Sequence, residues 1–163
     1  MIDPDRSNFN PAYVENELDK LDGTLNEELH VFVLGGAVMA MDGLKTGTKD
    51  IDVIVGDEKS HDILNKALQS CGYILLQTQD LSRPYQELSA TALQNLEGFR
   101  WEIFIKVVAK KLTLSDGMLN RARVMYKGTK LKVFRLSKED IFLMKGMTSR
   151  DKDLEDMFLM AKS

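Results

Sequence analysis

The sequence predicts a mixed α/β domain in which a short mixed β-sheet is flanked by helices, and three observations support that prediction. The chain has 163 residues, the length of one domain, and 44% of them are hydrophobic, which is enough to bury a core. Segments of alternating apolar residues are interleaved with segments of helical spacing. The sequence contains no internal repeat and no low-complexity linker. We therefore expect a single domain over residues 1–163, with an N-terminal helical segment at 1–29 and C-terminal helices at 137–163.

The N-terminal half of the chain alternates between helix and strand signals. Asn10 and Pro11 suit the cap and the first position of a helix, because Pro lacks the N–H group that a helix start leaves unpaired. A continuous apolar run at residues 31–34 is typical of a buried strand, and it ends abruptly at two glycines. The elements expected in this half are a helix from Asn10 to Leu25, strands at 31–34 and 51–55, a short helix at 37–41, a helix at 63–71 and a strand at 73–76.

The C-terminal half begins with the ambiguous segment 82–98, which fits either a helix or an irregular connection. Residues 99–105 alternate between apolar and polar side chains, a pattern that predicts a strand. Two apolar segments joined by residues 127–130 predict a basic hairpin with strands at 124–126 and 131–136. Ser137 begins a capping box that opens a helix through Met147, and a last helix is expected from about Arg150.

The cysteine and histidine content limits the kinds of site that this chain can build. One cysteine supports neither a disulfide framework nor a thiolate metal cluster, and two histidines do not supply a His-rich zinc site. No apolar run approaches the roughly 20 residues of a membrane span. The first residues lack the basic region of a signal peptide. These features predict a cytoplasmic protein with no membrane partner.

Residues 31–55 carry the groups best suited to chemistry. Gly35 and Gly36 lie between a strand and a helix, where phosphate can approach the backbone closely and where free N–H groups favour an anion. Asp50 and Asp52 are two residues apart on a strand, so their carboxylates point to the same face. Such a pair repels itself unless a divalent cation lies between, and Mg²⁺ binds carboxylates together with substrate phosphates. Taken alone, the Gly-Gly pair also fits a tight turn, and the Asp pair also fits an exposed strand edge. The order and spacing of the two pairs favour the functional interpretation.

Gly35-Gly36, followed by Asp50-Ile51-Asp52-Val53 at this spacing, resembles the nucleotidyltransferase superfamily typified by DNA polymerase β. The resemblance implies a nucleotidyltransferase-like fold and a third metal carboxylate on a later strand, where this chain has Glu102. The family more often has Asp there, and Glu102 also fits a solvent-facing residue of a half-exposed strand. The catalytic and metal-binding residues implied are Asp50, Asp52 and Glu102, with Mg²⁺ or Mn²⁺ as the cofactor.

Residues 139–157 are similar to the tail of small prokaryotic single-domain nucleotidyltransferases, including relatives of the abortive-infection and toxin–antitoxin type. In those proteins a Lys and an Arg/Asp motif lie near the nucleotide, which implies nucleotide binding by Lys145, Arg150 and Asp153. Each of these also has a structural interpretation. The Lys145 ammonium can reach from an apolar helix to water, and Arg150 and Asp153 can stabilise a helix electrostatically.

The corner before Asp50 departs from the family pattern. Many relatives have an Arg four residues before the first metal carboxylate, where this chain has Thr46. Lys45 and Lys49 lie nearby in the sequence. We assign nucleotide binding at this corner to Lys49, together with Gly35 and Gly36.

The resemblance implies a metal-dependent transfer of a nucleoside monophosphate from an NTP such as ATP to the hydroxyl of an acceptor. The alternative is a non-catalytic module that binds a nucleotide or nucleic acid, as one half of a toxin–antitoxin pair; Glu102 and Thr46 support it. A metal-dependent glycosyltransferase is a third interpretation, but it would need a larger sugar-nucleotide domain than 163 residues provide.

The charge of the chain is unevenly distributed. The net charge is −3, yet the stretch from Lys106 to Lys132 has eight bases and one acid, a local charge of +7. A basic surface of this kind can guide a polyanionic acceptor such as RNA or tRNA. The same bases also fit a solvated hairpin, in which case the acceptor is a protein or another hydroxyl compound.

Overall fold

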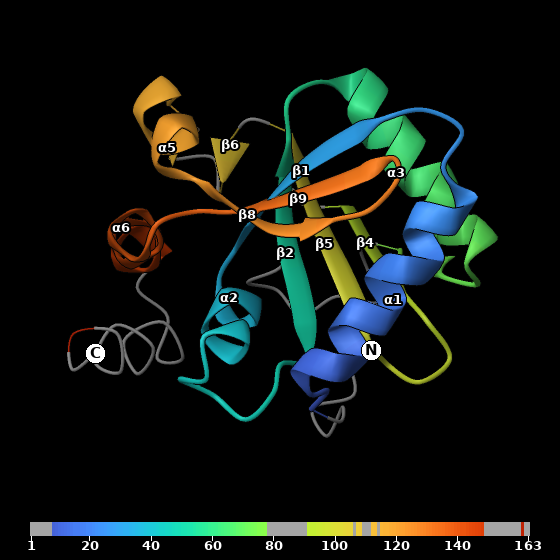
Figure 1. Cartoon of the computed structure of the whole chain (residues 1–163), viewed down its shortest axis with the longest axis horizontal. Helices are drawn as coiled ribbons and strands as arrows, with labels where there is room; N and C mark the ends of the chain where they lie inside the picture. The colour runs from blue at the N-terminus through green and yellow to red at the C-terminus, as the bar shows by residue number, and fades with distance from the viewer. Residues whose placement is uncertain are drawn as a thin grey trace.

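The chain folds into a seven-stranded mixed β-sheet with helices packed against it (Figure 1), as the computed structural model shows for residues 8–77, 91–105, 107–108, 112–113, 115–148 and 161. The predicted α/β class with a mixed sheet is therefore confirmed. The helices are α1 (Pro11–Thr24), α2 (Gly36–Met41), α3 (Glu58–Ser70), α5 (Asp116–Arg121) and α6 (Lys138–Thr148). The strands are β1 (Leu29–Leu34), β2 (Asp50–Val55), β3 (Ile74–Leu75), β4 (Thr91–Gln94), β5 (Arg100–Ile105), β6 (Val107–Val108), β7 (Leu112–Thr113), β8 (Arg123–Lys127) and β9 (Leu131–Arg135).

The order of the strands places β2 in the middle of the sheet. The order is β3-β4-β5-β2-β1-β9-β8, and β6 and β7 form a separate two-stranded sheet. Strand β2 runs parallel to β5 and antiparallel to β1, while β1 runs parallel to β9. In this register Asp52 lies opposite Leu34 on one side and Glu102 on the other. The two strands with predicted carboxylates are therefore direct neighbours.

The local signals that predict the elements are visible in the structure. The Asn10 side chain accepts a hydrogen bond of 2.9 Å from the Tyr13 N–H, as expected of a helix cap. In the ambiguous segment, residues 91–94 form strand β4. The sequence does not predict helix α5. This helix has six residues and buries only Met118, so its apolar residues form no periodic pattern. The helix predicted from about Arg150 lies outside the described residues.

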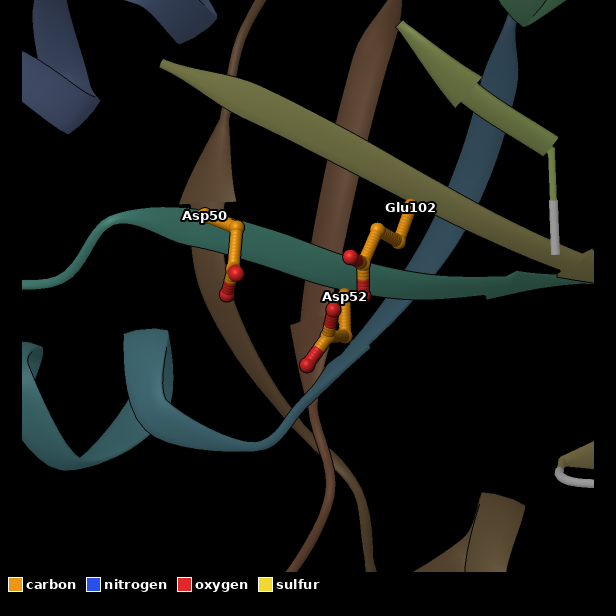
Figure 2. A group of neighbouring side chains, drawn as sticks. All are labelled: Asp50, Asp52 and Glu102. Atoms are coloured by element: carbon orange, nitrogen blue, oxygen red, sulfur yellow. The ribbon is translucent and has the colours of Figure 1, made fainter. Parts of the chain in front are cut away.

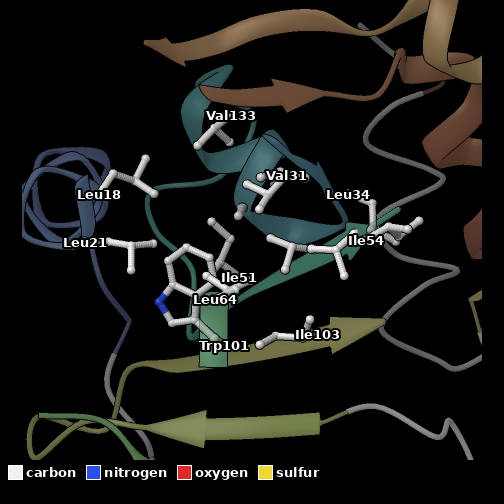
Figure 3. Close-up of a cluster of buried hydrophobic side chains, with 14 of the residues drawn as sticks. Leu18, Leu21, Val31, Leu34, Ile51, Ile54, Leu64, Trp101, Ile103 and Val133 are labelled. Carbon is white, nitrogen blue, oxygen red and sulfur yellow. The ribbon is translucent and has the colours of Figure 1, made fainter. Parts of the chain in front are cut away.

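One face of the sheet packs against α1 and α3, and this is where the hydrophobic core lies (Figures 1 and 3). Leu18 and Leu21 of α1 and Leu64 of α3 are completely buried. From the sheet, Trp101 of β5 is the largest side chain in this cluster. Because side chains alternate along a strand, the neighbours of the core residues in β2 and β5 point to the opposite face. Among the described helices, none has both the length and the apolar content to cross a membrane.

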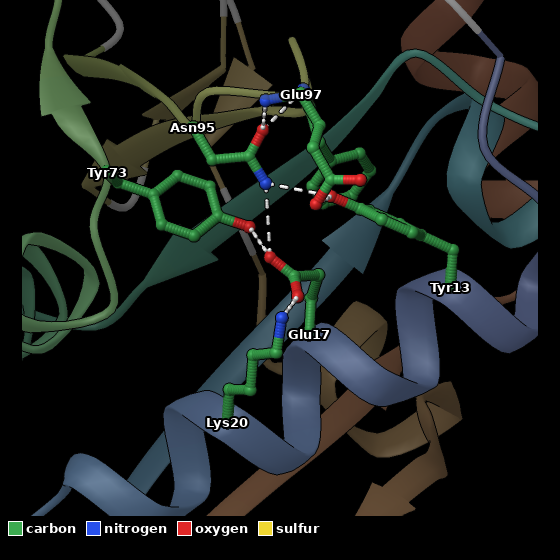
Figure 4. Close-up of polar contacts among 7 residues, drawn as sticks. Tyr13, Glu17, Lys20, Tyr73, Asn95 and Glu97 are labelled. Atoms are coloured by element: carbon green, nitrogen blue, oxygen red, sulfur yellow. Dashed lines mark hydrogen bonds and ion pairs between the residues drawn. The ribbon is translucent and has the colours of Figure 1, made fainter.

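A buried carboxylate on α1 connects this helix to the turn before β5 (Figure 4). Glu17 is only 6% exposed and accepts hydrogen bonds from the Tyr73 hydroxyl at 2.8 Å and from Asn95 Nδ2 at 3.1 Å. Lys20 forms an ion pair with it at 2.8 Å. Burial and the contact with Glu17 raise the pKa of Tyr73, so this hydroxyl remains a donor. Asn95 Oδ1 in turn accepts from the Phe99 N–H at 2.9 Å, which fixes the chain just before β5 begins.

A second carboxylate on α1, Asp22, holds the turn between β8 and β9. Its oxygens accept backbone hydrogen bonds from Thr129 at 3.0 Å, Lys130 at 2.8 Å and Leu131 at 2.7 Å. A Cβ at Gly128 would overlap this carboxylate, so the turn needs a glycine there. Burial acts to raise the pKa of Asp22, but the three N–H donors outweigh it and the pKa is lowered.

We predict that Asp22→Ala lowers the free energy of unfolding by about 1–3 kcal/mol at pH 7, because three backbone donors lose their acceptor. Since the pKa is lowered in the folded state, this stabilisation is present above the usual value of 3.8 and is lost as the pH falls through the lower folded value. Urea denaturation at several pH values measures both effects. Glu15→Ala, at an exposed position of the same helix, is the matched control. Equal stability of Asp22→Ala and the wild type at pH 7 would contradict the prediction.

Candidate functional site

Three carboxylates meet on the face of the sheet opposite α1 and α3. Asp50 and Asp52 are two residues apart on β2, and Glu102 lies beside Asp52 on β5. Each offers an oxygen, and these three oxygens lie within 4.8 Å of one another. Figure 2 shows the three side chains converging from the two strands. The structure thus brings together the three residues predicted as catalytic and metal-binding.

The surroundings of Asp50 and Glu102 leave these two carboxylates little contact with water. Asp50 and Glu102 are each 3% exposed, and Asp52 is half-buried. Burial, followed by the charges of Asp52 and Asp50, raises the pKa of Glu102 well above its usual value. Glu102 Oε1 is buried and accepts no hydrogen bond from the described residues. A set of carboxylate oxygens this close together is suited to a hard divalent cation such as Mg²⁺ or Mn²⁺.

Gly35 occupies a position that only glycine fits. It follows β1 directly and has φ +77°, a conformation that side chains rarely adopt. A Cβ at Gly35 would lie 2.7 Å from Asp52 Oδ2, too close for any real contact. The backbone of this residue therefore passes immediately beside the carboxylate cluster.

Gly36 faces a different set of groups. A Cβ there would lie 3.6 Å from Thr48 Oγ1 and 3.7 Å from Lys45 Nζ, which are ordinary contact distances. The Thr48 hydroxyl donates a hydrogen bond of 2.8 Å to the Asp50 carbonyl oxygen. A small side chain is therefore compatible with the fold at Gly36, but it would occupy space between the backbone and these two polar groups.

A cavity of about 380 Å³ lies at the same corner, lined by Asn8 and by residues 45–49. Lys49, predicted to bind the nucleotide, lines it, and so does Lys45. Lys45 is not among the predicted site residues, although its ammonium lies next to Gly36. The signal was present, because Lys45 stands one residue before the position at which the family has its Arg.

Arg100 was also missed. It lies opposite Asp50 in the register of β2 and β5, and it is 2% exposed. Its guanidinium donates to Gln94 Oε1 from Nε at 3.2 Å and from Nη2 at 2.8 Å. Its positive charge acts to lower the pKa of Glu102 and so moderates the repulsion within the cluster. The alternation of β5 places Arg100 and Glu102 on one face, which is the signal that identifies it.

Nucleotide binding by Lys145, Arg150 and Asp153 stays a prediction. Lys145 belongs to α6, of which only the backbone is described at that position. Arg150 and Asp153 lie outside the described residues.

The basic stretch from Lys106 to Lys132 is described only in part. Arg121 forms an ion pair of 2.8 Å with Asp140, and Lys132 forms one of 2.8 Å with Glu28. The turn at residues 128–130 precedes Leu131, which pairs with Leu29, the first residue of β1. The carboxylates lie at the other end of this strand. Within the described part of the stretch, Arg121 and Lys132 therefore lie at separate places, and the basic acceptor surface stays a prediction.

Two solved structures are similar to the chain over almost its whole length. The first is the lincosamide antibiotic adenylyltransferase LnuA with lincomycin bound, at 16% sequence identity and a TM-score of 0.59, covering 95% of this chain and 98% of that one. The second is a candidate nucleotidyltransferase from Thermotoga maritima, at 15% identity and a TM-score of 0.58, covering 97% and 98%. At such identities the likeness shows the fold alone.

The family comparison covers most of the sequence. None of the curated proteins compared matches the chain. A family model does match, over residues 12–160, and its description is "Nucleotidyltransferase of unknown function (DUF6036)". The matched range includes both glycines and all three carboxylates. With this match and the nucleotidyltransferase fold, the chain belongs to this family of nucleotidyltransferases.

Proposed function

We propose that this protein transfers a nucleoside monophosphate from an NTP to an acceptor hydroxyl, with a divalent cation held by Asp50, Asp52 and Glu102. The observation that carries the proposal is the convergence of these three carboxylates, two of them buried and Asp52 half-buried, with oxygens within 4.8 Å of one another. A divalent cation bound there supplies charge neutralisation for the phosphates and fixes their orientation.

The groups around Gly36 suit the phosphates of the NTP. The ammonium of Lys45 lies beside Gly36, and Lys49 lines the same cavity. Without side chains at Gly35 and Gly36, the phosphates can approach the backbone between the carboxylates and the two lysines. The triphosphate is then bound by cations on one side and lies against the carboxylate cluster on the other.

In the proposed reaction, the acceptor oxygen bonds to the α-phosphorus, the bond from this phosphorus to the bridging α–β oxygen breaks, and pyrophosphate leaves. The acceptor hydroxyl loses its proton to a base. Glu102 serves as the third ligand or as this base. Most of the rate enhancement comes from fixed geometry and charge neutralisation.

The NTP and the acceptor are to be identified by experiment. We propose ATP as the first NTP to test, and RNA, tRNA or a protein hydroxyl as the acceptor, as in a toxin–antitoxin system. The protein is incubated with each labelled NTP, total RNA and Mg²⁺, and labelled RNA and labelled protein are separated on gels. Transfer of label with release of pyrophosphate, lost on addition of EDTA, supports the proposal. Failure with all four NTPs and both acceptor classes would count against it.

We predict that Asp50→Asn/Asp52→Asn weakens the binding of Mn²⁺ by roughly 100-fold, because two of three charged ligands become neutral. Without metal, the same variant should melt at a higher temperature than the wild type, since the repulsion among the carboxylates is relieved. Isothermal titration and thermal melting in EDTA measure the two effects. Asp62→Asn, at an exposed site on α3, should change neither. Wild-type Mn²⁺ affinity in the double variant would show that the cation is not held here.

We predict opposite outcomes for the two glycines. Gly36→Ala should unfold at a urea concentration close to that of the wild type but bind NTP about tenfold more weakly, because its methyl group projects between the backbone and Lys45. Gly35→Ala should lose about 2 kcal/mol or more of stability from its positive φ alone, and the approach to Asp52 adds to this. Urea denaturation and NTP titration separate the two cases. Unchanged NTP affinity in a folded Gly36→Ala protein would exclude a phosphate site there.

A further inference from the structure

The sheet face that carries the carboxylates continues across β1 and β9 as an aromatic strip, formed by His30, Phe32, Phe134 and Val124. Residues paired across strands share a face, and Phe32 pairs with Phe134, which pairs with Val124. The rings of Phe32 and Phe134 are stacked with centroids 5.3 Å apart, and His30 meets Phe134 edge-on at 5.5 Å. This strip has no part in the site described above.

The aromatic strip is more open than the rest of its face. All described side chains of β2 are buried except the half-buried Asp52, and those of β5 are buried except its last residue. Phe32 and Phe134 are half-buried, and Val124 is 56% exposed. Partly exposed rings on a sheet surface provide a platform on which other planar rings stack.

The strip lies next to the carboxylates. Leu34, two residues beyond Phe32 on the same face, pairs with Asp52. One strand, β1, separates β2 from β9, so Phe134 is about two strand spacings, or ~10 Å, across the sheet from β2. A ligand lying on the strip therefore has one end close to the proposed metal site.

A cationic cavity of about 650 Å³ borders the strip at Val124. Its charged lining consists of Arg121, Arg123, Arg135 and Lys138 and one acid, Glu139. Arg121 and Arg135 also bind Asp140 and Asp42, which fixes their side chains, while Arg123 is exposed at the start of β8. Since the charges of Arg121 and Arg135 are offset by these carboxylates, the exposed side chain of Arg123 provides the cation that suits a phosphate-bearing ligand.

We propose that the aromatic strip and the cationic cavity bind the acceptor, and that this acceptor is the end of a single-stranded nucleic acid. A base stacks on Phe134 and Phe32, a backbone phosphate lies in the cavity near Arg123, and the terminal hydroxyl points toward the carboxylates. This assignment rests on the proposed function.

The test measures binding alone, so it does not depend on catalysis or on the metal. A fluorescent single strand of about 12 nucleotides is titrated with the protein in EDTA, and its anisotropy is followed at several salt concentrations. The variants are Phe134→Leu, which keeps an apolar side chain without a ring, and Arg123→Gln. Lys66→Gln, exposed on α3, is the charge control. Val124→Glu places an acid on the exposed part of the strip and provides a second variant if Phe134→Leu unfolds.

We expect binding that is stronger for the single strand than for a duplex and that weakens about tenfold with Phe134→Leu or Val124→Glu. Arg123→Gln should lower the slope of log affinity against log salt by about 0.7, while Lys66→Gln leaves it unchanged. Wild-type binding that is absent at low salt, or unchanged in the folded variants, would overturn the proposal. So would a dimer in sedimentation that Phe134→Leu dissociates, because a second copy would then cover the strip. Each negative result leaves the Mn²⁺ and NTP titrations untouched, so the two proposals fail separately.

Discussion

The parallel pairing of β2 with β5 is the constraint on which the candidate site depends. Its register sets Asp52 beside Glu102 and Asp50 beside Arg100. Asp50 and Glu102 are buried and only Asp52 is partly exposed, so water relieves little of their repulsion. Burial and neighbouring charge accordingly raise the pKa of Glu102, and Arg100 offsets only part of this. This repulsion among the three carboxylates is the electrostatic basis of the cation site that we propose.

The other side of the site follows from the antiparallel pairing of β1 with β2. Because Leu34 lies opposite Asp52, the backbone of residue 35 lies directly beside the Asp52 carboxylate. A side chain at this position would overlap the carboxylate, so the residue is a glycine. The same lack of side chains leaves backbone accessible between Asp52 and the ammonium of Lys45. The glycine that the fold requires at position 35 thus also leaves room for the phosphates in the function that we propose.

Helix α1 holds the sheet at two separate places through two carboxylates. Glu17 fixes the turn that precedes β5 through its contacts with Tyr73 and Asn95. Asp22 fixes the turn between β8 and β9. The first contact sets the start of the strand that carries Glu102, and the second sets the hairpin that supplies Phe134. Polar contacts of α1 therefore position both the strand that carries Glu102 and the hairpin of the proposed acceptor strip, although none of the site residues named above lies on α1.

The sequence by itself determined the elements whose signals are local, and the site residues that lie close together in the chain. These signals depend only on residues that are close in the chain, so a linear pattern contains them. Examples are the cap at Asn10, the apolar run before Gly35 and the i, i+2 spacing of Asp50 and Asp52. Short elements such as β4 and α5 bury too few side chains to leave a periodic signal, so they were not found.

Only the tertiary structure decided which distant groups meet. That Glu102 lies beside Asp52 depends on the register of two strands that are fifty residues apart, and this register results from packing against α1 and α3. The place of Lys45 beside Gly36 depends on the path of the loop between α2 and β2. Among the described bases of the stretch from Lys106 to Lys132, Lys132 pairs with Glu28 beside β1 and Arg121 pairs with Asp140 of α6, so the fold places these two at separate positions. Charge in a sequence is additive along the chain, whereas a binding surface depends on which side chains the fold places on one face.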